Sequence, residues 1–294
     1  MRIFVSSPNT AVLDEILKRC PGMKLNVLLT MARMPNNFPD FLGKYRGIID
    51  ELALDSGTFS LENSNLDISP QQLFARFAVF AKESGHDFDL IFSFDENFGP
   101  NGFEVNSMHL AELEERGVKV IPVIHNVNNH ELDTCINAGY EFVAIGKQKG
   151  KTKPHVLFPA VIKLYQYGIK VHLFGVTEFS LISGCPAWSC DSKSWLNDAT
   201  TGVVRFWNPM SPGIDKTDLI YFPNELGKTK NGTFLYSDYE YIDEFTKFIN
   251  SVGLTIYDLI GNKASVYLEF LGMLYYKTIE GVVTEMHLNN PLFL

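Results

Sequence analysis

Short apolar runs, separated by helical or turn-rich stretches, recur through the first two-thirds of the chain and constrain its fold more than any other feature. Most of these runs are continuously apolar rather than alternating, as expected for parallel strands that are buried on both faces. Eight runs can be recognised, at residues 2–7, 25–30, 51–57, 89–96, 118–125, 142–147, 170–176 and 187–192. Eight strands with helices between them predict an α/β fold, a (β/α)8 TIM barrel.

Three of the intervening segments have the features of helices. Residues 70–84 begin with a proline and carry apolar residues at helical spacing, and residues 107–117 end on a glycine, a usual C-terminal stop. Residues 155–168 are similar, and Pro159 is expected to kink that helix.

Two other arrangements of the runs stay open. A doubly wound open sheet is the second interpretation, but no Gly-x-Gly-x-x-Gly motif follows any run. The sequence therefore gives no support for a dinucleotide site, and no cofactor is expected. In the other arrangement, the runs at 2–7 and 25–30 form a hairpin outside the barrel, and a later segment such as 203–207 supplies a strand.

The regular recurrence of apolar runs ends near residue 197. We therefore predict a barrel with its active-site mouth over residues 1–196, and a turn-rich, mainly helical extension over residues 197–294 that packs on or near the barrel. Two helices are expected in the extension, one from about residue 238 to 253 and one from about 256 to 281.

Composition excludes several classes of protein. No segment approaches the roughly 20 apolar residues of a membrane helix, so no membrane partner is expected. The net charge of −9 argues against broad non-specific adhesion to nucleic acid or anionic membrane. The N-terminus lacks the apolar run of a signal peptide and the chain has four cysteines, so a reducing cytoplasm is the expected location.

Polar residues stand at the ends of several runs. They are Asp55, the Asp95–Glu96 pair, His125, Gly146 with Lys147, and Asp191. In a parallel barrel the carboxyl ends of the strands face one mouth, where the active site lies. A single acid there often caps the next helix, but several polar strand ends that converge favour a catalytic site. Two carboxylates permit covalent displacement at a sugar carbon, one attacking the anomeric carbon while the other handles the proton.

Five local sequences resemble motifs of the tRNA-guanine transglycosylase family. Asp-Ser-Gly-Thr-Phe at 55–59 resembles its Asp-Ser-Gly-Gly-Phe/Tyr signature, and Phe-Asp-Glu at 94–96 resembles its Phe-Asp-Glu. Ala-Ile-Gly at 144–146 resembles its base-contacting Ile-Gly-Gly segment, and His-Leu-Phe-Gly-Val at 172–176 is similar to its strand ending in Met-Gly-Val. Asp191 falls where the family has its nucleophilic Asp. The motifs keep the family's order and look closest to the phage-type, DNA-modifying branch.

The resemblance implies a role for each matching residue. Asp191 would attack C1′ of a guanosine and form a covalent glycosyl-enzyme, while Asp55 would move the proton at the departing or incoming base. Asp95 would hydrogen-bond the edge of a guanine-like base, and His125 stands where the family has a Gln that reads the base carbonyl. The other residues of the implied base site are Ser56, Phe59, which would stack on the base, Glu96, Gly146 and Gly175.

The implied function is that of a pentosyltransferase that exchanges guanine in nucleic acid for a free 7-deazaguanine base such as preQ0. The family's zinc site needs three closely spaced Cys and a downstream His, whereas no Cys follows Cys190 here, so no metal is expected. Without the zinc lobe, and with a short tail, DNA is a better candidate substrate than tRNA. A phage-encoded enzyme would act in the host cytoplasm, and a homodimer is compatible with the sequence.

Four cations close to one predicted strand end are candidates for contacts with a phosphate backbone. They are Lys147, Lys149, Lys151 and Lys153. Two alternative functions stay open: a nucleoside or glycoside hydrolase that uses the same carboxylates, and a non-catalytic nucleic-acid-binding relative. The acidic balance favours the hydrolase over the transglycosylase, whereas the lysine cluster favours the transglycosylase.

Overall fold

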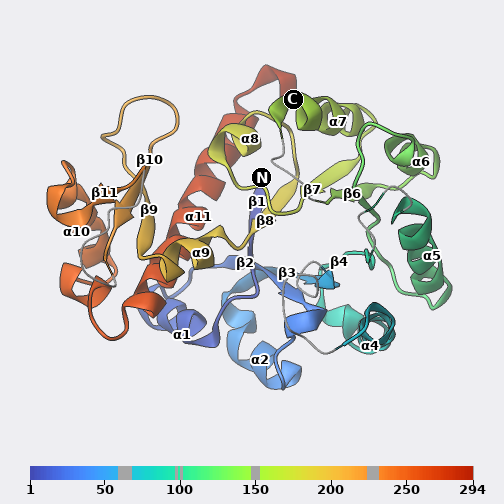
Figure 1. Cartoon of the computed structure of the whole chain (residues 1–294), viewed down its shortest axis with the longest axis horizontal. Coiled ribbons are helices and arrows are strands. Elements are labelled where there is room, and N and C mark those ends of the chain that lie inside the picture. The colour runs from blue at the N-terminus through green and yellow to red at the C-terminus, as the bar shows by residue number, and fades with distance from the viewer. Residues whose placement is uncertain (59–67, 97–98, 100–101, 147–152, 224–231, 294) are drawn as a thin grey trace. The chain divides into compact units, whose positions relative to one another are not determined.

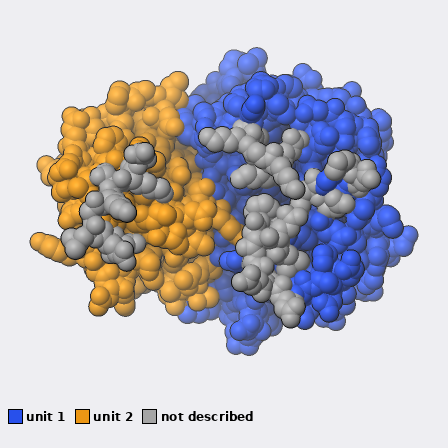
Figure 2. Space-filling view, in the orientation of Figure 1, with its two compact units in different colours: residues 1–7, 25–192, 286–294 blue, residues 8–24, 193–285 orange. Residues whose placement is uncertain are grey.

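The computed structural model describes residues 1–58, 68–96, 99, 102–146, 153–223 and 232–293, which form two compact units. The first unit comprises Met1–Ser7, Leu25–Ser192 and Met286–Leu294, and the second comprises Pro8–Lys24 and Lys193–Glu285 (Figure 2). Each unit has its own buried core and is described by itself below.

The first unit is built on eight parallel strands, in the order β4-β3-β2-β1-β8-β7-β6-β5 (Figure 1). They are β1 (Arg2–Ser6), β2 (Leu25–Thr30), β3 (Ile49–Asp55), β4 (Leu90–Ile91), β5 (Val123–Ile124), β6 (Phe142–Ile145), β7 (Lys170–Leu173) and β8 (Ser189–Ser192). Each strand lies within or overlaps one of the eight predicted runs, and the predicted α/β barrel class is confirmed.

The two ends of the sheet join through a parallel bridge between Phe92 and Ile121. The Ile121 amide donates to the Ile91 carbonyl at 2.8 Å, and the Ser93 amide donates to the Ile121 carbonyl at 2.8 Å. These bonds close the barrel between β4 and β5. Both strands are short, and Pro122 contributes to this because it has no amide hydrogen to donate to a neighbouring strand.

The barrel interior is filled by one residue from each of six neighbouring strand positions. This buried cluster consists of Phe4, Leu28, Ala53, Phe92, Val123 and Ala144. It mixes large rings, branched aliphatic side chains and small alanines, as is usual where eight strands leave just enough room for side chains. The interior is therefore a packed core, and chemistry is confined to the mouth at the carboxyl ends of the strands.

Helices follow most strands of the first unit and lie outside the barrel in Figure 1. They are α2 (Phe38–Tyr45), α4 (Pro70–Ser84), α5 (Gly102–Glu115), α6 (Glu131–Asn137), α7 (Pro154–Gln166) and α8 (Phe179–Ser183). The predicted helix at 70–84 is confirmed at both ends. Its start is fixed by a capping box, in which Ser69 caps the Gln72 amide and Gln72 caps the Ser69 amide. The helix that contains Pro159 is also present.

The second unit combines helices with a small separate sheet. The candidate strand at 203–207 belongs to this sheet and not to the barrel, and the runs at 2–7 and 25–30 pair in parallel within the barrel rather than as a hairpin outside it. Strands β9 (Val203–Trp207) and β10 (Thr217–Tyr221) pair antiparallel, and β11 (Phe234–Leu235) lies parallel to β10. The helices are α1 (Thr10–Arg19), α9 (Ser194–Thr200), α10 (Ile242–Ser251) and α11 (Ala264–Leu288), whose last residues belong to the first unit. Both expected C-terminal helices are present, but the second begins and ends about seven residues later than predicted, at Ala264 and Leu288. None of the helices in the described ranges is long and apolar enough to cross a membrane.

Candidate functional site

The acids, His125 and the two glycines of the predicted site lie at the carboxyl ends of barrel strands, which all point to one edge because the strands are parallel. Asp55 ends β3, Asp95 follows β4, and His125 follows β5. Gly146 and Gly175 follow β6 and β7, and Asp191 lies in β8. Strand order places β8 and β4 on opposite sides of the closed barrel, with three strands between them in either direction. Asp191 and Asp95 therefore lie on opposite sides of one mouth.

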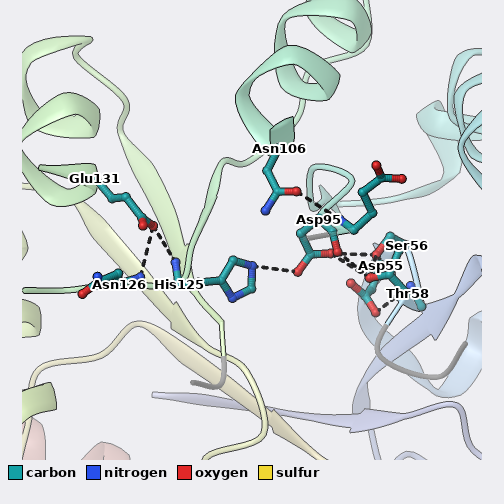
Figure 3. A network of polar contacts seen from close by, with 10 residues as sticks. Asp55, Ser56, Thr58, Asp95, Asn106, His125, Asn126 and Glu131 are labelled. Carbon is teal, nitrogen blue, oxygen red and sulfur yellow. Dashed lines mark hydrogen bonds and ion pairs between the residues drawn. The ribbon is translucent and has the colours of Figure 1, made fainter. Parts of the chain in front are cut away.

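The carboxylate of Asp95 is the centre of the first polar cluster, on the β3–β5 side of the mouth (Figure 3). Its Oδ1 atom accepts hydrogen bonds from the Ser56 hydroxyl at 2.8 Å and from the Thr58 hydroxyl at 3.2 Å. Thr58 also donates to the Asp95 carbonyl at 2.6 Å. The Nε2 atom of His125 lies 3.2 Å from Oδ2. Asp95 is only 8% exposed, and these groups replace the water that would otherwise solvate its carboxylate.

The turn that carries Ser56 and Thr58 depends on Gly57. Its φ of +77° is unfavourable for other residues, and a Cβ atom there would lie 2.8 Å from the Cβ of Ala32. The Gly57 amide donates to Oδ2 of Asp55 at 3.1 Å. Glycine at this position thus lets the chain reverse direction, so that Asp55 and the two hydroxyls lie side by side at the end of β3.

His125 fits against the barrel because Gly146 has no side chain. A Cβ atom on Gly146 would lie 2.2 Å from Cε1 and 2.3 Å from Nδ1 of the His125 ring. The backbone of His125 is fixed from the other direction by Glu131 at the start of α6. One carboxylate oxygen of Glu131 accepts from the amides of His125 at 2.8 Å and Asn126 at 3.1 Å. Glu131 was not predicted as a site residue, although an acid at the start of a helix is a common signal for such capping.

Glu96 does not join the Asp95 cluster through any of its described contacts. Its Oε1 atom lies 3.5 Å from Nε2 of His109 on α5, and its amide donates to Oδ1 of Asn106 at 3.1 Å. The His109 ring in turn packs against Phe74 and Phe94. The structure thus directs the Glu96 carboxylate toward α5, while Asp95 and His125 come together.

Asp191 is the centre of the second polar cluster, on the β8 side. Its Oδ2 atom accepts from the Ser6 hydroxyl at 2.5 Å, and its Oδ1 atom accepts from the Gly175 amide at 2.8 Å. The Nε2 atom of His172 lies 3.6 Å from Oδ1, an ion-pair distance rather than a hydrogen bond. Burial by itself raises the pKa of Asp191, but the interaction with His172 and the hydrogen bonds from Ser6 and Gly175 outweigh it and hold the pKa below the ordinary value of 3.8. Asp191 is therefore ionised at neutral pH.

His172 belongs to the motif at 172–176, but the sequence predicts no role for it. In the structure it lies directly beneath Asp191. The ring is fully buried, and its Nδ1 atom is 2.8 Å from the Ser189 hydroxyl. Strand geometry explains the placement, because residues two apart in a strand share a face. Ser189 and Asp191 therefore point the same way from β8, and His172 is the register partner of Ser189 on β7.

Some predicted contacts fall outside the described residues: Phe59, Lys147, Lys149 and Lys151. Lys153 is exposed and immediately precedes α7. Within the described ranges, no group of three or more His, Cys, Asp or Glu side chains is placed to hold a metal ion.

A pocket of about 190 Å³ lies on the helix side of β4 and β5, next to α5 and α6. Its wall is mostly apolar and includes Phe94, Leu110 and Val123. Asp95 lines it, whereas Asp55 and Asp191 do not. The carboxylates of the mouth therefore do not meet in this pocket.

No protein-family model and no curated protein matches the chain. Among solved structures, it is similar to a candidate fructose-1,6-bisphosphate aldolase from Coccidioides immitis, with a TM-score of 0.51 and 10% identity over 97% of this chain and 90% of that one. It is also similar to a candidate tagatose 6-phosphate kinase from Sinorhizobium meliloti 1021, with a TM-score of 0.44 and 12% identity over 97% and 86% of the two chains. At 10% identity, the likeness to the aldolase supports the barrel fold alone.

Proposed function

We propose that the protein is a base-exchange transglycosylase that replaces guanine in nucleic acid, DNA rather than tRNA, with a free 7-deazaguanine base such as preQ0. The observation that carries the proposal is the pair of opposed carboxylates at one barrel mouth. Asp191 is ionised and held by Ser6 and Gly175, and Asp95 lies across the mouth beside His125. A nucleoside laid across this mouth would place its sugar near Asp191 and its base near Asp95.

In the first chemical step, a carboxylate oxygen of Asp191 forms a bond to C1′ while the bond from C1′ to N9 of guanine breaks. The electron pair of the broken bond leaves with the base, which takes a proton from Asp55. In the second step, Asp55 removes the N9 proton of the incoming base, whose nitrogen attacks C1′ and releases the Asp191 carboxylate. Both steps gain from groups held in line before reaction, because orientation supplies much of the rate when the nucleophile is weak.

Asp55 is suited to the proton-transfer role by its position. It ends β3, the strand that carries the turn with Ser56 and Thr58, and it is only half-buried. The amide of Gly57 donates to Oδ2 of Asp55 and so orients the carboxyl group. A partly exposed carboxylate can exchange its proton with solvent between the two halves of the reaction.

Asp95 would read the base through one oxygen. The lone pairs of Oδ1 are directed at the hydroxyls of Ser56 and Thr58, so Oδ2, next to His125, faces the donors of a guanine-like edge. Guanine and 7-deazaguanines both offer N1–H and an exocyclic amino group as donors. His125 adds an imidazole nitrogen beside that oxygen, suited to the base carbonyl.

The lysines at 147–153 supply the proposed contact with the nucleic-acid backbone. Of these, Lys153 lies in the described part and is exposed to solvent. With a net charge of −9, the rest of the chain adds little general attraction, so a local patch of cations would decide where the polymer binds.

The test is base exchange measured by nucleoside mass spectrometry. Duplex DNA, single-stranded DNA and tRNA, each containing labelled guanine, are incubated with the protein with and without preQ0. Release of labelled guanine only when preQ0 is present, with a deazaguanosine recovered in the DNA, supports the proposal. Release of guanine without added base, leaving abasic sites, would instead identify a hydrolase that uses the same carboxylates. No release from any polymer would overturn both.

Trapping on a denaturing gel identifies the nucleophile. Asp191→Asn keeps the shape of the side chain but removes the attacking charge, so no covalent adduct with DNA should form. Asp133→Asn is the matched control, because Asp133 pairs with Lys163 on the surface of the same unit. An adduct that persists in Asp191→Asn and is absent from Asp55→Asn would move the nucleophile to Asp55.

A further inference from the structure

A buried histidine and serine lie beneath the Asp191 carboxylate, and the reaction steps described above do not use them. The His172 ring is surrounded inside the barrel by Phe4, Phe92 and Phe174, at centroid distances of 5.9, 4.6 and 4.7 Å. Both His172 and Ser189 are fully buried. A polar ring in such apolar surroundings is costly unless its nitrogens have partners. The Ser189 hydroxyl is the hydrogen-bond partner of Nδ1. The Nε2 atom makes no hydrogen bond and faces Asp191.

The Ser189 hydroxyl can either donate to Nδ1 of His172 or accept from it, so the charge of Asp191 decides between the two neutral tautomers of the ring. When the hydroxyl donates to Nδ1, the neutral ring carries its proton on Nε2; when the ring is protonated, both nitrogens carry hydrogen. In either form an N–H group points at Oδ1 of Asp191. The remaining tautomer would aim a lone pair at the carboxylate and is disfavoured by electrostatic repulsion.

The two oxygens of Asp191 are held in different ways. Oδ1 is fixed by the backbone amide of Gly175 and faced by His172, whereas Oδ2 is held by the hydroxyl of Ser6, which can rotate away. The oxygen whose partner can move is the one free to form a bond. The groups packed against Asp191 in the described residues come from β1, β7, β8 and the turn after β7, and His172 is the titratable one among them.

We propose that His172, held through Nδ1 by Ser189, is a positioning residue that reserves Oδ1 of Asp191 as the non-reacting oxygen and directs Oδ2 to the sugar carbon. This inference rests on the proposed function for the identity of the reaction, but not for the contact itself. In the glycosyl-enzyme, Oδ1 becomes the ester carbonyl and accepts from Gly175 and His172. When the incoming base displaces Asp191, the same donors stabilise the carboxylate that leaves.

Three variants separate this role from simple packing. His172→Phe fills the space but removes the donor, and His172→Gln returns an N–H group near the position of Nε2. Ser189→Ala keeps the imidazole but removes the hydrogen-bond partner of its Nδ1 atom. Thermal unfolding is measured for each variant, so that a fold defect is seen independently of activity.

The first measurement needs no substrate. The carboxyl carbon of Asp191 is titrated by ¹³C NMR, with its signal assigned by its loss in Asp191→Asn. Its midpoint should rise in His172→Phe, rise less in Ser189→Ala, and return toward the parent value in His172→Gln. An unchanged midpoint in His172→Phe, with the fold intact, overturns the inference whether or not the protein exchanges bases.

The second measurement is the pH profile of adduct formation and turnover. In His172→Phe the rate should fall roughly 10²-fold, as expected when a reacting group is misplaced, and its acidic limb should move to higher pH. His172→Gln should recover most of the rate. If the Asp191 midpoint shifts in the variants as expected but the parent protein exchanges no base, the proposed function is wrong and the contact between His172 and Asp191 is still supported. Equal rates and equal profiles in all variants would overturn the positioning role.

Discussion

The two sides of the barrel mouth hold their carboxylates by different means. On the β8 side, the Ser6 and His172 partners of Asp191 belong to neighbouring strands, and the Gly175 amide lies in the turn after β7. On the β4 side, Asp95 is held by a turn at 56–58 and by His125, which is itself fixed by Glu131 from a helix. The first carboxylate is thus part of the barrel wall, and the second depends on connecting segments.

This difference fits the two tasks that the proposed function gives to Asp191 and Asp95. A group that forms and breaks a covalent bond gains from a rigid position, because small displacements of the reacting atom are costly in rate. A group that recognises a ligand gains from neighbours that can adjust to it, and loops on a rigid barrel supply such neighbours. We therefore expect substitutions on the β8 side to change turnover, and substitutions on the β4 side to change affinity for the base.

The largest effects should come from exchanging each carboxylate for an amide. Asp191→Asn should lower turnover by at least about 10³-fold with little change in affinity for the base. Asp95→Asn should weaken affinity for the free base about 10- to 100-fold, the loss expected for a hydrogen bond to a charged group, and lower turnover less. Steady-state exchange kinetics with varied preQ0 measure both. If the two variants lose turnover equally at unchanged affinity, the two sides share one task and the comparison fails.

Gly146→Ala should be the most disruptive small substitution on the β4 side. The added Cβ atom would overlap the His125 ring, so the ring or the strand end must shift, at a cost of about 2–3 kcal/mol in the free energy of unfolding. Gly43→Ala in α2 is the matched control, since nothing lies within 4 Å of its Cβ position, and it should be neutral or slightly stabilising. Urea unfolding compares the two. A Gly146→Ala protein as stable as Gly43→Ala would mean that His125 is not confined by β6.

Glu131→Ala should have a smaller effect that reaches the site through His125. It leaves the amides of His125 and Asn126 without their acceptor, and we expect a loss of about 1–2 kcal/mol because Asn126 is exposed and can turn to water. Glu131→Gln keeps an oxygen for these amides and should lose less. Affinity for the base should fall in Glu131→Ala, with turnover preserved at saturation. A fall in turnover alone would show that the β5 end does not serve base recognition.

The barrel was predictable from the sequence because its strands are continuous apolar runs separated by capped helices. Residues 25–30 form a strand and residues 70–84 a helix with the predicted bounds. The runs at 89–96 and 118–125 hold only two strand residues each, because hydrophobicity alone does not report where pairing stops. The segment 203–207 was a candidate strand, but its place in a separate three-stranded sheet was not predicted, since no local pattern connects partners such as Arg205 and Leu219.

The strand-end acids could be picked out for a physical reason, since parallel strands bring their ends to one mouth. His172 and Glu131 could not be given roles in the same way. A run that is apolar throughout does not show which of its residues face the barrel interior, so the place of His172 beneath Asp191 became visible only with the register of β7 on β8. Glu131 acts on backbone amides, and such contacts depend on the path of the loop between β5 and α6.

The smallest effect concerns the pH dependence of stability on the β8 side. The pKa of Asp191 in the folded protein is below its ordinary value, despite burial, because of His172, Ser6 and Gly175. A carboxyl with a lowered pKa contributes stability above the pKa of the unfolded chain, and loses it as pH falls through the folded value. The free energy of unfolding of the parent, minus that of Asp191→Asn, should therefore be constant near neutral pH and decline below about pH 4. Urea unfolding from pH 7 to pH 3 measures this difference. A difference that instead grows as pH falls would mean that burial raises the pKa of Asp191 more than its three partners lower it. The β8 side would then not hold an ionised carboxylate for the proposed reaction.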